Sequence, residues 1–144
     1  MSFSVRFDKD TATLHSAVSG ILSADDVAAW DAALFAATGS LAPRTRFQVI
    51  DDLQGYDVAA QDPSVHQLMR VVSPKFLAAH EFTVGFWRLY EQTPPPPTQP
   101  SVCWRVAHLH HDCDKMDRYN ELLATETERF FCATDQAHAW LGIG

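Results

Sequence analysis

The sequence is poor in the features that mark several classes of protein. It has 6 glycines in 144 residues, and none belongs to a glycine-rich phosphate loop. It has 11 basic and 18 acidic residues, for a formal net charge of -7. It contains no cluster of basic residues that could bind the phosphates of a nucleic acid. No apolar run approaches the roughly 18 residues of a membrane-spanning helix. We therefore expect neither nucleic-acid binding nor a membrane span.

Cysteine is also scarce. Cys103, Cys113 and Cys132 are an odd number and contain no C-x-x-C pair. This pattern suits reduced thiols better than a disulfide framework. Buried cysteines behave as small hydrophobic residues, and we expect that role for at least two of the three. The sequence therefore predicts free thiols and a cytoplasmic protein.

What is present is the composition of an ordinary folded domain. Apolar residues make up 47% of the chain and charged residues 20%, which disfavours disorder and fibrous classes. A length of 144 residues is typical of one domain with one core. We expect a single domain over residues 1–144.

The first third of the chain predicts a hairpin, a helix and a buried strand. Residues 3–7 alternate apolar and polar side chains, and a turn leads into a second strand at about 13–22. Ser23 can cap a helix that ends at Gly39. Residues 47–50 are a short apolar run, as expected of a central strand.

The rest of the chain continues to alternate helices and strands. Asp62-Pro63 predicts a helix start, and Ser73-Pro74 repeats the signal. Residues 82–90 fit a strand and a helix equally well. The remaining segments predict a strand at 102–109, a helix from Asp112 or Asp114 through Leu123, a strand at 129–132 and a helix from Asp135 to Gly142. The expected order is ββαβα, the open segment, then βαβα.

Residues 73–100 combine aromatic residues with a proline tract. Prolines 94–97, followed by Pro100, predict an extended and exposed connection. The aromatic residues before them are Phe76, Phe82, Phe86, Trp87 and Tyr90. They are more than a small domain readily buries, and exposed apolar patches of this kind mark interfaces. The sequence therefore predicts a homodimer.

The C-terminal third carries the most recognisable pattern. Its parts are the strand Val102–Leu109, a helix with Met116, Tyr119 and Leu122, the run Arg129-Phe130-Phe131 and the ending Gln136–Gly142. Together with the opening hairpin, the helix start at Ser23–Asp26 and the strand Phe47–Leu53, this resembles the SpoIIAA-like branch of the STAS (sulfate transporter and anti-sigma factor antagonist) fold.

The resemblance implies a fold and a mode of action. The fold is α/β, with a mixed sheet of four to five strands and helices packed mainly on one face. Proteins of this kind act through binding, either of a partner protein or of a small apolar ligand. Residues 73–100 depart from the pattern as a proline-rich aromatic insertion.

Polar side chains gather where two predicted strands end. Ligands commonly bind at the carboxyl ends of strands in open α/β sheets. The residues that we expect at such a site are Asp51, Asp52, Tyr56, His108, His110 and His111. Paired carboxylates serve as acid and base only where their pKa values are pushed apart. For Asp51 and Asp52 we therefore favour capping of the turn at Gln54-Gly55.

The segment His108–Asp114 leaves two other functions open. His108, His110, Asp112 and Cys113 carry donor atoms that zinc accepts, although no standard metal-binding spacing is present. Cys113 beside His111 could also form a thiolate. We predict a non-enzymatic binding module without a cofactor. The alternatives are a metal-dependent or cysteine-based enzyme built on this segment, and a structural interaction subunit.

Overall fold

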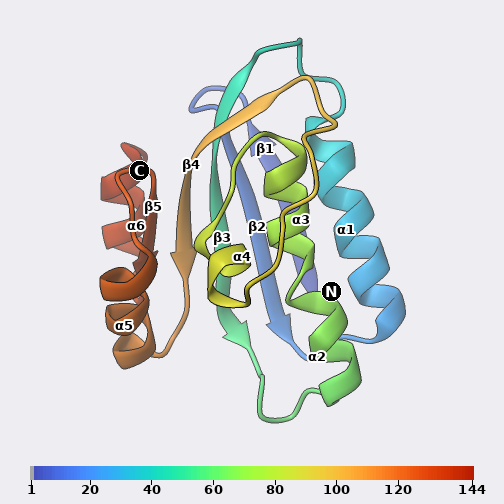
Figure 1. Ribbon diagram of the computed structural model, residues 1–144, viewed down its shortest axis with the longest axis vertical. Helices are drawn as coiled ribbons and strands as arrows, with labels where there is room; N and C mark the ends of the chain where they lie inside the picture. Colours follow the sequence, from blue (N-terminus) through green and yellow to red (C-terminus); the bar gives the residue numbers. More distant parts are fainter. Residues whose placement is uncertain (1) are drawn as a thin grey trace.

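Five strands form one mixed sheet in a computed structural model that describes residues 2–144 (Figure 1). The strands are β1 (Phe3–Asp8), β2 (Thr13–Gly20), β3 (Arg46–Tyr56), β4 (Val102–Leu109) and β5 (Glu128–Phe131). They lie in chain order across the sheet, with β1 and β2 antiparallel and the later pairs parallel. The predicted α/β class with a mixed sheet is confirmed.

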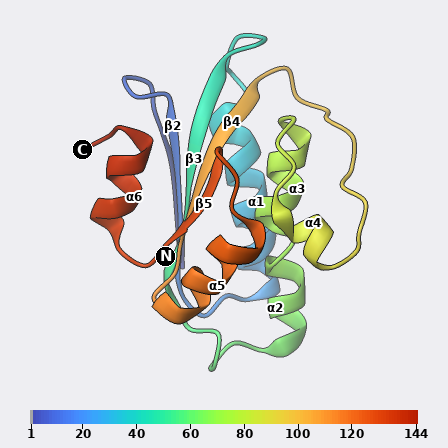
Figure 2. The same ribbon diagram turned by 60° about the vertical axis from the view of Figure 1, so that its left-hand side comes forward.

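The helices cover the two faces of this sheet unequally. They are α1 (Ala24–Thr38), α2 (Pro63–Met69), α3 (Val72–Ala79), α4 (Gly85–Leu89), α5 (Cys113–Leu123) and α6 (Thr134–Leu141). Helices α1 to α5 lie on one side and α6 lies on the other (Figure 2). The helices therefore pack mainly on one face, as predicted. Within residues 2–144, no helix combines the length and the apolarity needed to cross a bilayer.

The helix ends show why these segments fold as they do. The Ser23 hydroxyl accepts a hydrogen bond of 3.1 Å from the Asp26 amide. In return, the Asp26 carboxylate accepts a hydrogen bond of 2.9 Å from the Ser23 amide. Asp62 caps α2 before Pro63, and Asp112 caps α5. The prediction for the last helix was wrong in one detail, because α6 has Ala133 at its N-cap position and Asp135 lies in its first turn.

Strand β3 is longer than predicted and contains the acidic pair. It continues from Arg46 to Tyr56, so Asp51 and Asp52 lie inside the strand and not at its end. Aspartate disfavours strands in isolation, but β3 is hydrogen-bonded to β2 on one side and β4 on the other. Pairing on both sides outweighs the local preference. Strand β2 ends earlier than predicted, at Gly20, which has a φ of 66°.

The segment left open by the sequence is helical in part and contains both buried and exposed residues. Residues 82–90 contain the short helix α4 and no strand. Phe76, Phe82 and Trp87 are only 1%, 8% and 7% exposed. The expectation that this segment exposes a large aromatic surface was therefore wrong, because α3 and the turn after it pack into the main core.

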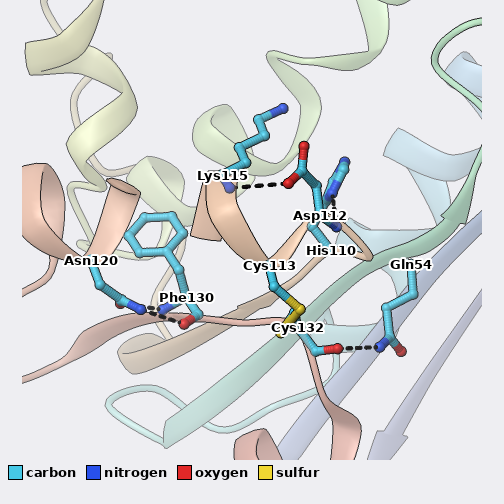
Figure 3. The surroundings of a disulfide bond; sticks show 8 residues. All are labelled: Gln54, His110, Asp112, Cys113, Lys115, Asn120, Phe130 and Cys132. Carbon is cyan, nitrogen blue, oxygen red and sulfur yellow. Dashed lines mark hydrogen bonds between the residues drawn. A yellow bond between two sulfur atoms is a disulfide. The ribbon is translucent and has the colours of Figure 1, made fainter. Parts of the chain in front are cut away.

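The cysteine prediction was also wrong. Cys113 and Cys132 form a disulfide that joins the first residue of α5 to the residue after β5 (Figure 3). Only Cys103 is a free and buried thiol. Cys113 and Cys132 are 19 residues apart in the sequence, and only the return of the chain through β5 brings them together. The reasoning that led to a cytoplasmic protein loses this support, and the compartment stays a prediction.

Candidate functional site

A cavity of about 220 Å³ opens between the sheet and the helices on the face that carries α1 to α5. Strands β3, β4 and β5 contribute its floor, and helices α2, α4 and α5 contribute its walls. Its main apolar lining residues are Trp30, Leu53, Met69, Val84, Phe86 and Leu123. One of the walls, α4, belongs to residues 73–100, the segment that departs from the predicted family pattern.

A charged triad forms the polar part of the floor. The His108 ring donates Nδ1–H to Asp51 Oδ2 at 3.2 Å and Nε2–H to Glu128 Oε2 at 2.8 Å. The three side chains are 18%, 8% and 4% exposed. A neutral imidazole has a single N–H, so these two bonds require the imidazolium form.

The second oxygen of each carboxylate also has a partner. The Ser73 hydroxyl donates to Asp51 Oδ1 at 3.1 Å, and the Gly85 amide donates to Glu128 Oε1 at 3.0 Å. A side chain at position 85 would press on Leu123, whose Cβ lies 3.0 Å from where a Cβ would be. The floor is therefore a closed set of hydrogen bonds, and it holds the starts of α3 and α4 against the sheet.

These contacts fix the charge of His108. Burial by itself lowers the pKa of this imidazole, but the hydrogen bonds and charges of Asp51 and Glu128 outweigh burial and raise it to about 9. The ring also stacks on Phe130, with centroids 4.6 Å apart and planes inclined by 13°. His108 is thus a protonated and immobilised residue whose two nitrogens are both occupied.

Strand register explains how the triad assembles. Asp51 pairs with His108 across β3 and β4, and His108 pairs with Phe130 across β4 and β5. Side chains two residues apart share a face of a strand, so Glu128 lies on the same face as Phe130. Sequence reasoning missed Glu128 because it started this strand one residue later, although the period of two was present.

Two cation–tyrosine pairs line the walls. The Arg70 guanidinium lies 4.5 Å from the centroid of the Tyr90 ring, and the Lys115 ammonium lies 5.7 Å from that of Tyr119. Near them, Tyr56 and His66 share a hydrogen bond of 2.9 Å and stack at 5.9 Å. Burial lowers the pKa of His66, and the charges of Arg70 and Lys115 lower it further. Sequence reasoning did not select Arg70, Lys115 or His66, because no motif marks them.

Four of the six residues expected at a ligand site line this one cavity. They are Asp51, Tyr56, His108 and His110. Asp52 points to the opposite face of the sheet, where it shares a hollow with His15 and His138. Its carboxylate accepts a hydrogen bond from the Gln54 amide at 2.9 Å, but β3 continues through Gln54 and Gly55 to Tyr56, so the turn-capping interpretation was wrong for Asp52. Asp51 binds His108 and Ser73, so turn capping was wrong for that residue as well.

The remaining expected residue, His111, is exposed and does not line the cavity. Its ring stacks on that of His110, with centroids 4.4 Å apart. Burial lowers the pKa of His110, and nearby charges of Lys115 and His111 lower it further. His110 is therefore a neutral side chain at the edge of the cavity.

The candidate metal ligands are engaged with different partners. His108 is hydrogen-bonded to two carboxylates, and His110 Nδ1 accepts a hydrogen bond of 3.1 Å from the Asp112 amide. The Asp112 carboxylate accepts the Lys115 amide at 3.1 Å, and Cys113 is in the disulfide (Figure 3). In the described chain from Ser2 onwards, no three His, Cys, Asp or Glu side chains form a group that could hold a metal ion.

Comparisons with known proteins give a structural neighbour but no matching family. No family model and no curated protein matches the sequence. Among solved structures, the chain is similar to an uncharacterized protein of the DUF3478 family from Shewanella loihica PV-4, described as having a SpoIIAA-like fold. The two share 15% identity with a TM-score of 0.46, over 96% of this chain and 91% of that one.

Proposed function

We propose that this chain is a non-enzymatic binding module that takes a small, largely apolar ligand into the cavity above the Asp51–His108–Glu128 triad. The observation that carries the proposal is the cavity itself, with its apolar walls and a few convergent polar groups. A dry apolar cavity of about 150 Å³ is large enough for benzene. The cavity of about 220 Å³ here suits a substituted ring or a short branched chain.

The chemistry of the triad supports binding over catalysis. A general acid or base must have a nitrogen or oxygen within reach of the reacting proton. Here each carboxylate oxygen accepts a bond from within the chain and both His108 nitrogens donate one. The triad therefore fixes the shape and charge of the floor. The cysteine-based alternative loses its nucleophile, because Cys113 is bonded to Cys132.

A cavity-filling series tests the proposal. We expect 4-fluorotoluene, an uncharged probe followed by 19F NMR, to bind the native protein at submillimolar to millimolar concentration. Leu53→Trp and Val58→Trp should abolish binding, because both positions line the cavity. Val58 is 47% exposed, so its replacement leaves folding intact even if Leu53→Trp does not.

Leu68→Trp is the matched control, because Leu68 is 52% exposed on α2 and does not line the cavity. This variant should bind the probe as the native protein does. The proposal fails if the native protein does not broaden or shift the probe resonance, or if both cavity variants bind it unchanged.

A further inference from the structure

Two basic side chains line the cavity without an acidic partner. Arg70 follows the last residue of α2, and Lys115 lies in the first turn of α5. In the part of the chain that the structure describes, both ion pairs belong to His108. The chain has 18 acidic residues for 11 basic ones, so acidic partners are plentiful. Nevertheless, among the described residues, neither Arg70 nor Lys115 forms an ion pair.

Arg70 also has an unused hydrogen-bond donor. Its Nε is buried and has no acceptor among residues 2–144. A buried donor without a partner costs free energy. The guanidinium lies over Tyr90 and the Lys115 ammonium lies over Tyr119, so aromatic rings hold both cations near the cavity.

The two cations act on the same part of the wall. Both charges add to burial in lowering the pKa of His66, which lines the cavity. Burial raises the pKa of Tyr119, and nearby Tyr90 raises it further. The two cation–tyrosine pairs and His66 therefore line the same cavity.

The floor of the cavity favours the other end of such a ligand. Asp51 and Glu128 carry two negative charges and His108 cancels one of them, so the triad keeps a net charge of -1. Each of its four carboxylate oxygens already accepts one hydrogen bond from within the chain. An anionic group is repelled from the floor and attracted to Arg70 and Lys115, while an apolar body can lie against Phe130 and Leu123.

We propose that the ligand is a small apolar monocarboxylic acid, with its carboxylate between Arg70 and Lys115 and its hydrocarbon body over the triad. This inference rests on the proposed function, because it names the ligand chemistry of the same cavity. Arginine forms paired hydrogen bonds with a carboxylate, and lysine adds a point charge. Two cations without a glycine-rich loop suit a carboxylate better than a phosphate ester.

Calorimetric titration with three molecules of one skeleton tests the inference. The probes are 3-phenylpropanoate, 3-phenylpropanamide and 3-phenylpropylamine, at pH 7.5 and low salt. We expect the acid to bind at least tenfold more tightly than the amide and the amine to bind most weakly. Arg70→Gln and Lys115→Gln should each weaken the binding of the acid about tenfold and leave the binding of the amide unchanged. Added salt should weaken the binding of the acid and leave that of the amide unchanged.

Matched variants separate a specific contact from a change of net charge or a loss of folding. Lys75→Gln removes one positive charge from an exposed position of α3 that does not line the cavity, and it should bind all three probes as the native protein does. Arg70→Lys keeps the charge and should retain part of the preference for the acid. If Arg70→Gln does not fold, Lys115→Gln and Arg70→Lys still decide the question.

Each outcome has one meaning. Equal binding of acid and amide, or tighter binding of the amine, overturns the carboxylate inference and leaves the proposed function in place. Binding of 4-fluorotoluene with no binding of the three probes also overturns the inference alone. Failure of all four molecules to bind overturns both.

Discussion

At the scale of single residues, His108 combines two properties that rarely occur together. It lies in the protein interior, where burial disfavours charge, and yet it is held as an imidazolium by two carboxylates. Removing one partner of such a buried network leaves an uncompensated charge, which is strongly destabilising. The triad is therefore a feature that stabilises the fold only while His108 keeps its proton.

The stability of the protein should consequently depend on pH. Because the pKa of His108 is raised from 6.5 to about 9 on folding, its contribution is complete below pH 6.5 and is lost as the pH rises through 9. We expect urea unfolding, followed by tryptophan fluorescence, to give a free energy of unfolding that is lower at pH 9 than at pH 6.5 by on the order of 3 kcal/mol. Burial lowers the pKa of four other histidines, so they titrate below pH 6.5 and contribute little to this change; they are His15, His66, His80 and His110.

Replacement of His108 provides the control for that experiment. His108→Gln should be less stable than the native protein at pH 6.5. Its free energy of unfolding should fall much less between pH 6.5 and pH 9. His111→Gln, at an exposed position outside the cavity, should keep the decline. A flat profile in the native protein, or an undiminished decline in His108→Gln, contradicts the assignment.

At the scale of elements, α5 is tied to β5 by two kinds of link. The disulfide joins Cys113 to Cys132, and the Asn120 side chain exchanges hydrogen bonds of 2.7 and 2.9 Å with the backbone of Phe130 (Figure 3). Helix α5 also carries Lys115, Tyr119 and Leu123 into the cavity. The position of this cavity wall therefore depends on the links between α5 and β5.

Removal of the disulfide should destabilise the protein. Its ends are 19 residues apart, and closing a loop of this size restricts the unfolded chain by about 2–4 kcal/mol. We expect Cys113→Ser combined with Cys132→Ser to lower the free energy of urea unfolding by about that amount. Dithiothreitol should have the same effect on the native protein and none on the double variant.

A thiol count checks the pairing independently. The native protein, unfolded in denaturant without reductant, should show one reactive thiol, that of Cys103. Three reactive thiols in protein kept from reductant throughout purification would contradict the disulfide and restore the original prediction of free cysteines.

At the scale of the whole molecule, the homodimer stays a prediction with a narrower basis. Of the aromatic residues that motivated it, Phe76, Phe82 and Trp87 are buried within the chain. What stays exposed is Tyr90 at 41% with its neighbour Leu89 at 39%, and Leu122 at 63% on α5. The Arg88 side chain donates to the Leu122 carbonyl oxygen, so these residues lie in one region.

Light scattering at micromolar concentration tests the association. We expect twice the mass of one chain for the native protein and the mass of one chain for Leu122→Glu, because a carboxylate in an apolar interface is costly to bury. Ile21→Glu is the control, since Ile21 is 56% exposed in the turn before α1. A monomer mass for the native protein contradicts the prediction.

The sequence by itself determined the order of the elements and most of their ends. Alternation in residues 3–7, the caps at Ser23 and Asp62, and the helix end at Gly142 are local signals, because each depends on neighbours within a few residues. The cap of α5 was left open between Asp112 and Asp114, and the structure shows Asp112. The same signals predicted that Asp51 and His108 share one site, and the structure places both at one cavity, although Asp51 lies inside β3 and not at its end.

Only the tertiary structure decided what those residues do. The length of β3 depends on strands from distant parts of the chain, and the Cys113–Cys132 pair depends on the return of the chain through β5. The triad needs side chains from three strands, and the two cations come from the residue after α2 and from the first turn of α5. These contacts join residues tens of positions apart, and no local pattern records which of many polar side chains will meet.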